Sequence, residues 1–183
     1  MKKGFTMIEL IFVIVILGIL ASVAIPRLAG TKADAEISAA VANLRTLVSD
    51  ANVYYVAKGG FEATGSGAAT SITTTWSQIT NVPVDDPNKA IGNNNSLKVG
   101  GVNCIDFLIR RENAATNQPA YILFAKNTKN TAGGGATSPV CQQVQNSSSL
   151  AHYFTSRVPG VSVSSGDANK GFIAIGSNTK LEK

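Results

Sequence analysis

A continuous apolar run near the N-terminus constrains this chain more than any other feature of its sequence. The run extends from Leu10 to Ile25, and one carboxylate, Glu9, stands at its edge. A helix over the stretch from Phe5 to Ile25 is long enough to cross a hydrocarbon core of roughly 30 Å. Because an unpaired ion there costs about 2.5 to 3.5 kcal/mol on insertion scales, Glu9 is expected to have a positively charged partner.

The charges that flank this run predict its orientation. Met1-Lys2-Lys3 form a short basic head, and little positive charge follows directly after Ile25. This asymmetry predicts a single-pass helix with its N-terminus in the cytoplasm and the rest of the chain outside. Cys104 and Cys141 agree with that topology. They lack metal-ligand spacing and are expected to form a disulfide, which requires an oxidising compartment such as the periplasm or cell surface.

Two simpler interpretations of the N-terminal segment remain open. A secretory signal peptide has the same basic start and apolar core, and Ala21-Ser22-Val23-Ala24 offers a cleavage site after Ala24. Against it, Glu9 stands where such peptides favour positive charge, and the helical pattern continues beyond Pro26. A plain membrane anchor explains the length of the run but leaves Glu9 without a partner.

The first residues also carry a family resemblance. The segment Gly4-Phe5-Thr6-Met7-Ile8-Glu9-Leu10-Ile11, with Gly18 and Ala24-Ile25-Pro26 after it, resembles the class III signal and N-terminal helix of type IV pilins and pseudopilins. The resemblance implies that a membrane-embedded prepilin peptidase cuts between Gly4 and Phe5. The same enzyme would methylate the new terminus, leaving N-methyl-Phe5. It also implies two further partners, an inner-membrane platform protein and a cytoplasmic assembly ATPase.

This processing would give the carboxylate a partner. Cleavage turns Phe5 into a cationic amino terminus, and Glu9 lies one helical turn further along, at an i, i+4 spacing. Spacing alone leaves open whether Glu9 pairs with its own Phe5 or with that of the next subunit. The resemblance implies the neighbour, which makes the pair an assembly contact. Replacing Glu9 with alanine is then expected to leave processing at Gly4 intact and to block incorporation into a filament.

Small residues and one proline shape the predicted helix. Gly18 and its small neighbours would let other helices approach closely, although such residues are also simply common in membrane helices. Pro26 removes a backbone donor and is expected to kink or locally melt the helix near Ser22, although it need not end the helix. Amphipathic spacing then continues to Lys58, where Gly59-Gly60 form a stop signal. The apolar members of this second half are Ile37, Val41, Leu44, Val48, Ala51 and Tyr55.

These patterns predict an α+β fold in which a small antiparallel sheet covers the second half of the long helix. The expected organisation is a leader peptide (1–4), a transmembrane and polymerisation helix (5–26), its amphipathic continuation (27–58) and a periplasmic or extracellular globular domain (59–183). Strands are expected at 120–125, 171–175 and 161–163, a helix over 150–158, either type over 104–111, and loops over 61–75 and 127–139.

No residue pattern indicates catalysis, a cofactor or a metal. His152, the one histidine, is expected on the surface or in packing, and Asp85-Asp86 precede a proline and are expected to form a turn. Asp167 and Asn169 match the calcium loop of some pseudopilins too thinly to assign a metal. Apart from Arg110-Arg111 the basic residues are scattered, so a nucleic-acid footprint is not established.

We therefore expect a structural protein. It would be cleaved, N-methylated and assembled through its N-terminal helix, leaving the inner membrane for a type IV pilus or related filament in the periplasm or at the cell surface. A pseudopilin of a type II secretion or competence (DNA-uptake) system is the alternative, since the two share everything through Pro26. A secreted or membrane-anchored binding domain with an ordinary signal segment is the third interpretation. The mature N-terminus discriminates, because signal peptidase would leave Ile25 rather than Phe5.

Overall fold

The computed structural model describes residues 6–64, 71–113, 118–127, 138–159, 161 and 170–176. The chain forms two compact units, Met1–Ala35 and Glu36–Lys183. The expected domain boundaries at residues 4, 26 and 58 stay predictions.

A long helix, α1, runs from Met7 to Lys58 and remains helical through Pro26, as expected. It ends at the predicted glycine pair. Gly59 has a φ of 72°, in the left-handed region that glycine enters without steric cost. The N–H of Gly60 donates to the carbonyl of Tyr55 at 3.0 Å, as in a Schellman motif, which satisfies a carbonyl that the helix end leaves without an intrahelical partner.

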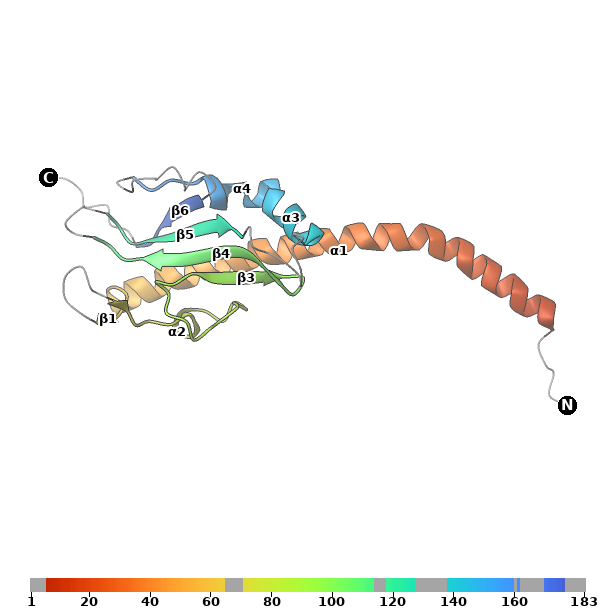
Figure 1. Cartoon of the computed structure of the whole chain (residues 1–183), viewed down its shortest axis with the longest axis horizontal. Helices are drawn as coiled ribbons and strands as arrows, with labels where there is room; N and C mark the ends of the chain where they lie inside the picture. Colours follow the sequence, from red (N-terminus) through yellow and green to blue (C-terminus); the bar gives the residue numbers. More distant parts are fainter. Residues whose placement is uncertain are drawn as a thin grey trace. The chain divides into compact units, whose positions relative to one another are not determined.

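The second unit contains a four-stranded antiparallel sheet (Figure 1). Its strands lie in chain order, so that each pairs with the next. They are β3 (Asn95–Val99), β4 (Val102–Arg110), β5 (Tyr121–Lys126) and β6 (Lys170–Ala174). Gly100 and Gly101 form the two-residue turn between β3 and β4, and both have positive φ, which tight hairpins of this kind require. The predicted α+β fold with a small antiparallel sheet is confirmed.

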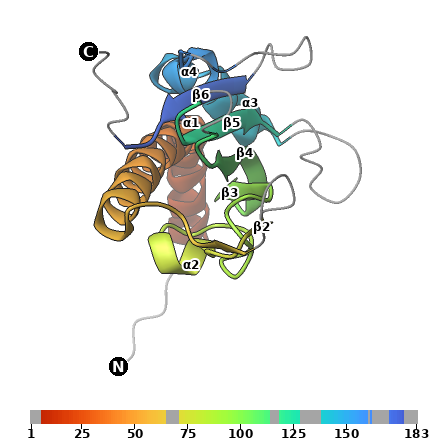
Figure 2. The same cartoon turned by 90° about the vertical axis from the view of Figure 1, so that its left-hand side faces the viewer.

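The register of the sheet places large apolar side chains opposite one another. Phe107 pairs with Phe124 and Ile109 with Ile122, and all four are fully buried. They share one core with the second-unit part of α1, which lies against one face of the sheet (Figure 2). Trp76, from the short helix α2 (Trp76–Ile79), meets Phe107 edge to face at 4.7 Å.

The buried stripe of α1 is rotated from the predicted one. Leu44 and Ala51 are fully buried as expected, but the predicted members Val41 and Val48 are only partly buried. Ala40 and Leu47, which the predicted stripe left out, are each at most 2% exposed. A set with spacings of four, three and four residues therefore faces the sheet: Ala40, Leu44, Leu47 and Ala51.

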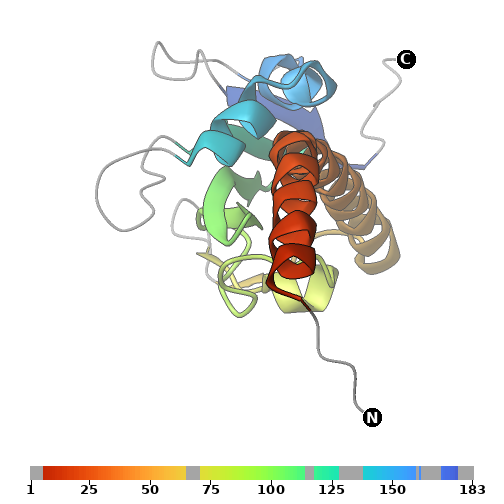
Figure 3. The same cartoon turned by 90° about the vertical axis from the view of Figure 1, so that its right-hand side faces the viewer.

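Two short helices, α3 (Pro139–Asn146) and α4 (Ser148–Thr155), lie beside the sheet (Figure 3). α4 packs against β6, and Gly171 makes that approach possible. A Cβ built at Gly171 would lie 1.9 Å from the carbonyl oxygen of Tyr153, so no other residue fits there without movement of the backbone. The N–H of Phe172 donates to the carbonyl of Ser156 at 3.0 Å, which ties β6 to the end of α4.

Several predicted elements are confirmed and others were missed. The strands expected at 120–125 and 171–175 are β5 and β6, the ambiguous segment 104–111 is strand β4, and the helix expected over 150–158 is α4. β3 and α3 were not predicted. β1 (Ala63–Thr64) and β2 (Ser71–Ile72) pair within a segment predicted as a loop. Most of 161–163 lies outside the described residues.

Candidate processing and assembly site

The predicted processing residues adjoin the start of the described chain. Gly4 and Phe5 lie outside the described residues, so cleavage and methylation there stay predictions. Thr6 is the first described residue and lies directly before Met7, the first residue of α1, and Glu9 lies in the first helical turn. The geometry between these two side chains is the best-defined part of the site.

Thr6 and Glu9 form a reciprocal cap at the start of α1. The N–H of Thr6 donates to Oε2 of Glu9 at 2.8 Å, and the Thr6 hydroxyl donates to the same oxygen at 2.7 Å. In return, the N–H of Glu9 lies 3.4 Å from the Thr6 hydroxyl oxygen, and the N–H of Leu10 donates to the Thr6 carbonyl at 3.3 Å. This is a capping box, which satisfies backbone donors that the first turn leaves without intrahelical partners.

This cap is a role of Glu9 that the sequence-based prediction missed. The signal was present, because Thr6-Met7-Ile8-Glu9 has the Thr-x-x-Glu spacing of a capping box. Cleavage after Gly4 would leave the Phe5–Thr6 peptide bond intact, so the Thr6 N–H remains available as a donor. Over the described part of the chain, Oε1 of Glu9 has no hydrogen-bond donor. The predicted pairing of Glu9 with an N-terminal amine is therefore untested and is compatible with the cap.

The apolar segment of the first unit is exposed along its whole length. From Met7 to Ile25 the large apolar side chains are between 40% and 82% exposed. Burying each such side chain is worth about 1.5 to 3 kcal/mol, so water is a poor environment for this helix. By length and composition α1 is able to cross a membrane, with none of its apolar window buried within the protein. This composition suggests membrane anchoring.

Nothing in the part of the chain that the structure describes explains a glycine at position 18. A Cβ built there meets no atom within 4 Å, although glycine in a helix costs up to about 1 kcal/mol relative to alanine. Nearby, the Ser22 hydroxyl donates to the Ile19 carbonyl at 2.7 Å, so its polar group is satisfied inside the helix. The open space at Gly18 fits the predicted close approach of another helix. That role, and the predicted kink at Pro26, stay predictions.

A second exposed stripe runs along α1 in the second unit. Its members recur at alternating spacings of three and four residues, on the side of the helix opposite the buried stripe. Val53 and Val56, at 65% and 71% exposed, are its large apolar members. We call it the outer seam: Ala39, Ala42, Thr46, Ser49, Val53 and Val56.

The predicted disulfide is confirmed. Cys104 on β4 and Cys141 on α3 are bonded, with their Cα atoms 5.5 Å apart and both residues fully buried. Gln145 supports the same junction, because its Nε2 lies 2.7 Å from the Cys104 carbonyl oxygen and 3.1 Å from that of Asn127. The bond therefore fixes α3, which follows residues outside the described chain, onto the sheet.

The other candidate residues do not gather into a reaction centre. Asp85 forms an ion pair with Lys98 at 2.8 Å, and Asp86 accepts from the N–H of Asn88 within a turn. Lys98 lowers the pKa of Asp85 chiefly by hydrogen bonding. His152 is exposed, with Nδ1 3.0 Å from the hydroxyl oxygen of Ser156 and its ring edge-on to that of Tyr153. In those segments no three acidic, histidine or cysteine side chains cluster as metal ligands, and Asp167 and Asn169 lie outside them.

Comparison with known proteins adds to this geometry. Residues 1–25 match the family described as the prokaryotic N-terminal methylation motif. The chain is 37% identical over 86 residues to the type II secretion system core protein G of Dickeya chrysanthemi, which covers 46% of this chain and 56% of that protein. It is 41% identical over 73 residues to a fimbrial protein of Neisseria meningitidis serogroup B, and this match covers 39% of this chain and 43% of that protein. No solved structure matches the chain.

Residues 1–25 thus match a methylation motif and include the apolar start of a long helix, and an α+β unit follows. The chain is similar both to pseudopilins of type II secretion and to a fimbrial protein, so the resemblance predicted from the first residues is confirmed. It spans about half the length of the curated relatives that it matches.

Proposed function

We propose that this chain is a prepilin-type filament subunit that assembles through its N-terminal helix into a type IV pilus or related filament. The observation that carries the proposal is the exposed apolar segment from Met7 to Ile25, with one carboxylate held at its start and a methylation motif over the same residues. In this proposal, prepilin peptidase cuts after Gly4 and methylates Phe5. The helix first spans the inner membrane with its N-terminus in the cytoplasm.

The cap suggests how Glu9 serves assembly. Oε2 holds the first turn through Thr6, which leaves Oε1 for the N-terminal amine of Phe5 in the neighbouring subunit. An ammonium within about 4 to 6 Å would offset the desolvation of the carboxylate in an apolar filament core. The carboxylate is thus oriented before its partner arrives, so little side-chain freedom remains to be lost when the pair forms.

The outer seam supports self-assembly of the second unit. Helices pack side by side along narrow stripes that repeat at three and four positions, and the outer seam has this spacing with small side chains and two valines. The exposed Val53 and Val56 gain nothing from their own fold, and contact with another copy would remove them from water. Because lipid and filament core are both apolar, transfer of the first unit gains little by burial alone. The proposal therefore includes an assembly ATPase acting through a platform protein.

The test begins with the mature protein. Mass spectrometry of the N-terminal peptide from membrane and sheared fractions is expected to give N-methyl-Phe5. Electron microscopy with an antibody to the chain should then label filaments. A mature terminus at Ile25 would point to signal peptidase and to a secreted or anchored binding domain, which contradicts the proposal. Processed protein that never enters a filament, in cells with an intact assembly system, would do so as well.

A second candidate is a pseudopilin of a type II secretion or competence system. The observation in its favour is that several matched relatives are named as type II secretion system core protein G. Such a subunit would form a short periplasmic filament rather than a long surface one. Deleting the gene and measuring exported proteins, surface filaments and DNA uptake in the same strain separates the three systems.

A further inference from the structure

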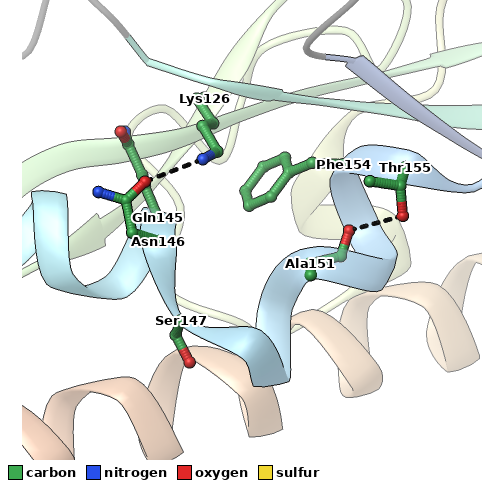
Figure 4. Close-up of a pocket in the computed structure, with 7 residues that line it drawn as sticks. All are labelled: Lys126, Gln145, Asn146, Ser147, Ala151, Phe154 and Thr155. Carbon is green, nitrogen blue, oxygen red and sulfur yellow. Dashed lines mark hydrogen bonds between the residues drawn. The ribbon is translucent and has the colours of Figure 1, made fainter.

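A surface cavity of about 220 Å³ lies between α3 and α4 of the second unit, at the end of β5 (Figure 4). Its walls have two different characters. Lys126 contributes an ammonium group and Asn146 an amide, whereas the ring of Phe154 and the methyl group of Ala151 form an apolar wall. None of these residues belongs to the processing and assembly site.

The ammonium of Lys126 has polar and aromatic neighbours. Its Nζ lies 3.1 Å from Oδ1 of Asn146 and 5.5 Å from the centre of the Phe154 ring. Within the described ranges, no carboxylate forms an ion pair with it. Because an ammonium has three N–H donors and only one is taken by Asn146, donors remain for a ligand.

The cavity is held in shape by the disulfide junction. Gln145, beside Asn146, donates to the carbonyls of Cys104 and Asn127, and its amide nitrogen lies 3.3 Å from the sulfur of Cys141. These contacts attach the end of α3 to β4. The position of Asn146 relative to Lys126 is therefore fixed before any ligand binds, which reduces the entropy lost on binding.

We propose that this cavity binds a carboxylate carried on a short apolar stem. The carboxylate would meet the Lys126 ammonium, and the stem would lie along Phe154 and Ala151. A phosphate fits less well, since the cavity offers one point charge and an apolar wall rather than the several donors or the forked guanidinium that phosphates favour. Free organic acids and the glutamate side chain of a peptide share this chemistry.

Nuclear magnetic resonance on the full-length protein in detergent micelles tests the site. Sodium butyrate is titrated at constant ionic strength, with butyramide as the uncharged probe of the same shape. We expect saturable shifts of the amides from Asn146 to Ala151, with half-saturation in the millimolar range that a single exposed ion pair supports. Butyramide at the same concentrations should produce less than a tenth of the shift.

Two variants and one control sharpen the result. Lys126→Gln should abolish saturation, and Ala151→Met, at an exposed helical position that tolerates methionine, should weaken binding at least tenfold by filling the cavity. Lys89→Gln removes the same charge elsewhere and should leave the titration unchanged. Shifts that stay linear, that butyramide reproduces, or that persist in Lys126→Gln would overturn the proposal.

A final arm identifies the source of the carboxylate. N-acetyl-Ala-Glu-Ala-amide is titrated against its glutamine counterpart. Saturation by the glutamate peptide assigns the cavity to acidic side chains of a polypeptide, whereas saturation by butyrate alone assigns it to free organic acids. Because binding is measured on unassembled protein, the outcome is independent of whether the chain forms filaments.

Discussion

Replacing Glu9 with glutamine separates the two roles assigned to this side chain. Glutamine has an oxygen that accepts from the Thr6 N–H, so it keeps the capping box, but it carries no charge for an N-terminal amine. Thr6→Val is the matched change. It removes the hydroxyl that donates to Glu9 Oε2 at 2.7 Å and keeps both the backbone donor and the charge.

The two variants are expected to weaken filament assembly by different amounts. Loss of a capping interaction costs about 1 kcal/mol, which reduces an equilibrium by roughly fivefold. Removing one member of a buried ion pair costs about 3 to 5 kcal/mol, which is more than 100-fold. If Glu9 pairs with a neighbour's amine, Glu9→Gln should therefore abolish detectable filaments, whereas Thr6→Val should leave a measurable fraction.

The assay measures the fraction of mature chain recovered in sheared filaments. This fraction is quantified by immunoblot, with cells that express equal amounts of each variant. Mass spectrometry confirms that both variants are still cut at Gly4, and circular dichroism in detergent confirms that their helix content is unchanged. Normal assembly of Glu9→Gln would refute the charge pairing. Loss of assembly in Thr6→Val with normal assembly of Glu9→Gln would show that the cap is what matters.

Three further predictions concern the second unit. Gly171→Ala should lower the free energy of unfolding by about 1 to 3 kcal/mol in a urea titration, because its Cβ overlaps a backbone carbonyl; an unchanged midpoint would contradict the packing of α4 on β6. Cys104→Ser/Cys141→Ser should cost about 4 kcal/mol by the loop-closure estimate, and equal stability with and without reductant in the unmodified chain would argue against it. Lys98→Gln should raise the pKa of Asp85 toward its ordinary value, which a carbon-detected titration of Asp85 measures. In the unmodified chain this ion pair stabilises the fold above the ordinary carboxyl pKa, and that stabilisation is lost as the pH falls through the lowered pKa of Asp85.

Much of the fold was predictable because local signals and tertiary packing agree. The length of α1, its glycine stop, β5 and β6 all follow from apolar spacing and turn residues. β3 was missed because Asn95-Ser96-Leu97-Lys98-Val99 looks polar, although pairing with β4 buries four of its five residues. α3 was missed because Pro139 suggests a loop, whereas proline is well suited to the first turn of a helix.

The candidate site was predictable in part for a different reason. The importance of Glu9 followed from the cost of a charge beside an apolar run, yet the donors that hold it come from Thr6, whose capping signal was not recognised. The proposed amine partner belongs to another copy. The Thr-x-x-Glu spacing within one chain does not identify the copy that supplies the amine, so that part of the site needs the assembly experiments.

The two stripes of α1 show how the buried face of the second half of this helix differs from the predicted one. Ala40, Leu44 and Leu47 face the sheet, while Val53 and Val56 lie on the opposite side among small residues. The predicted stripe included Val41 and Val48, which lie at the edge of the face toward the sheet and are only partly buried. Charged substitutions distinguish the faces. Leu47→Glu should prevent folding of the second unit, whereas Val53→Glu should leave it folded and act only where copies meet.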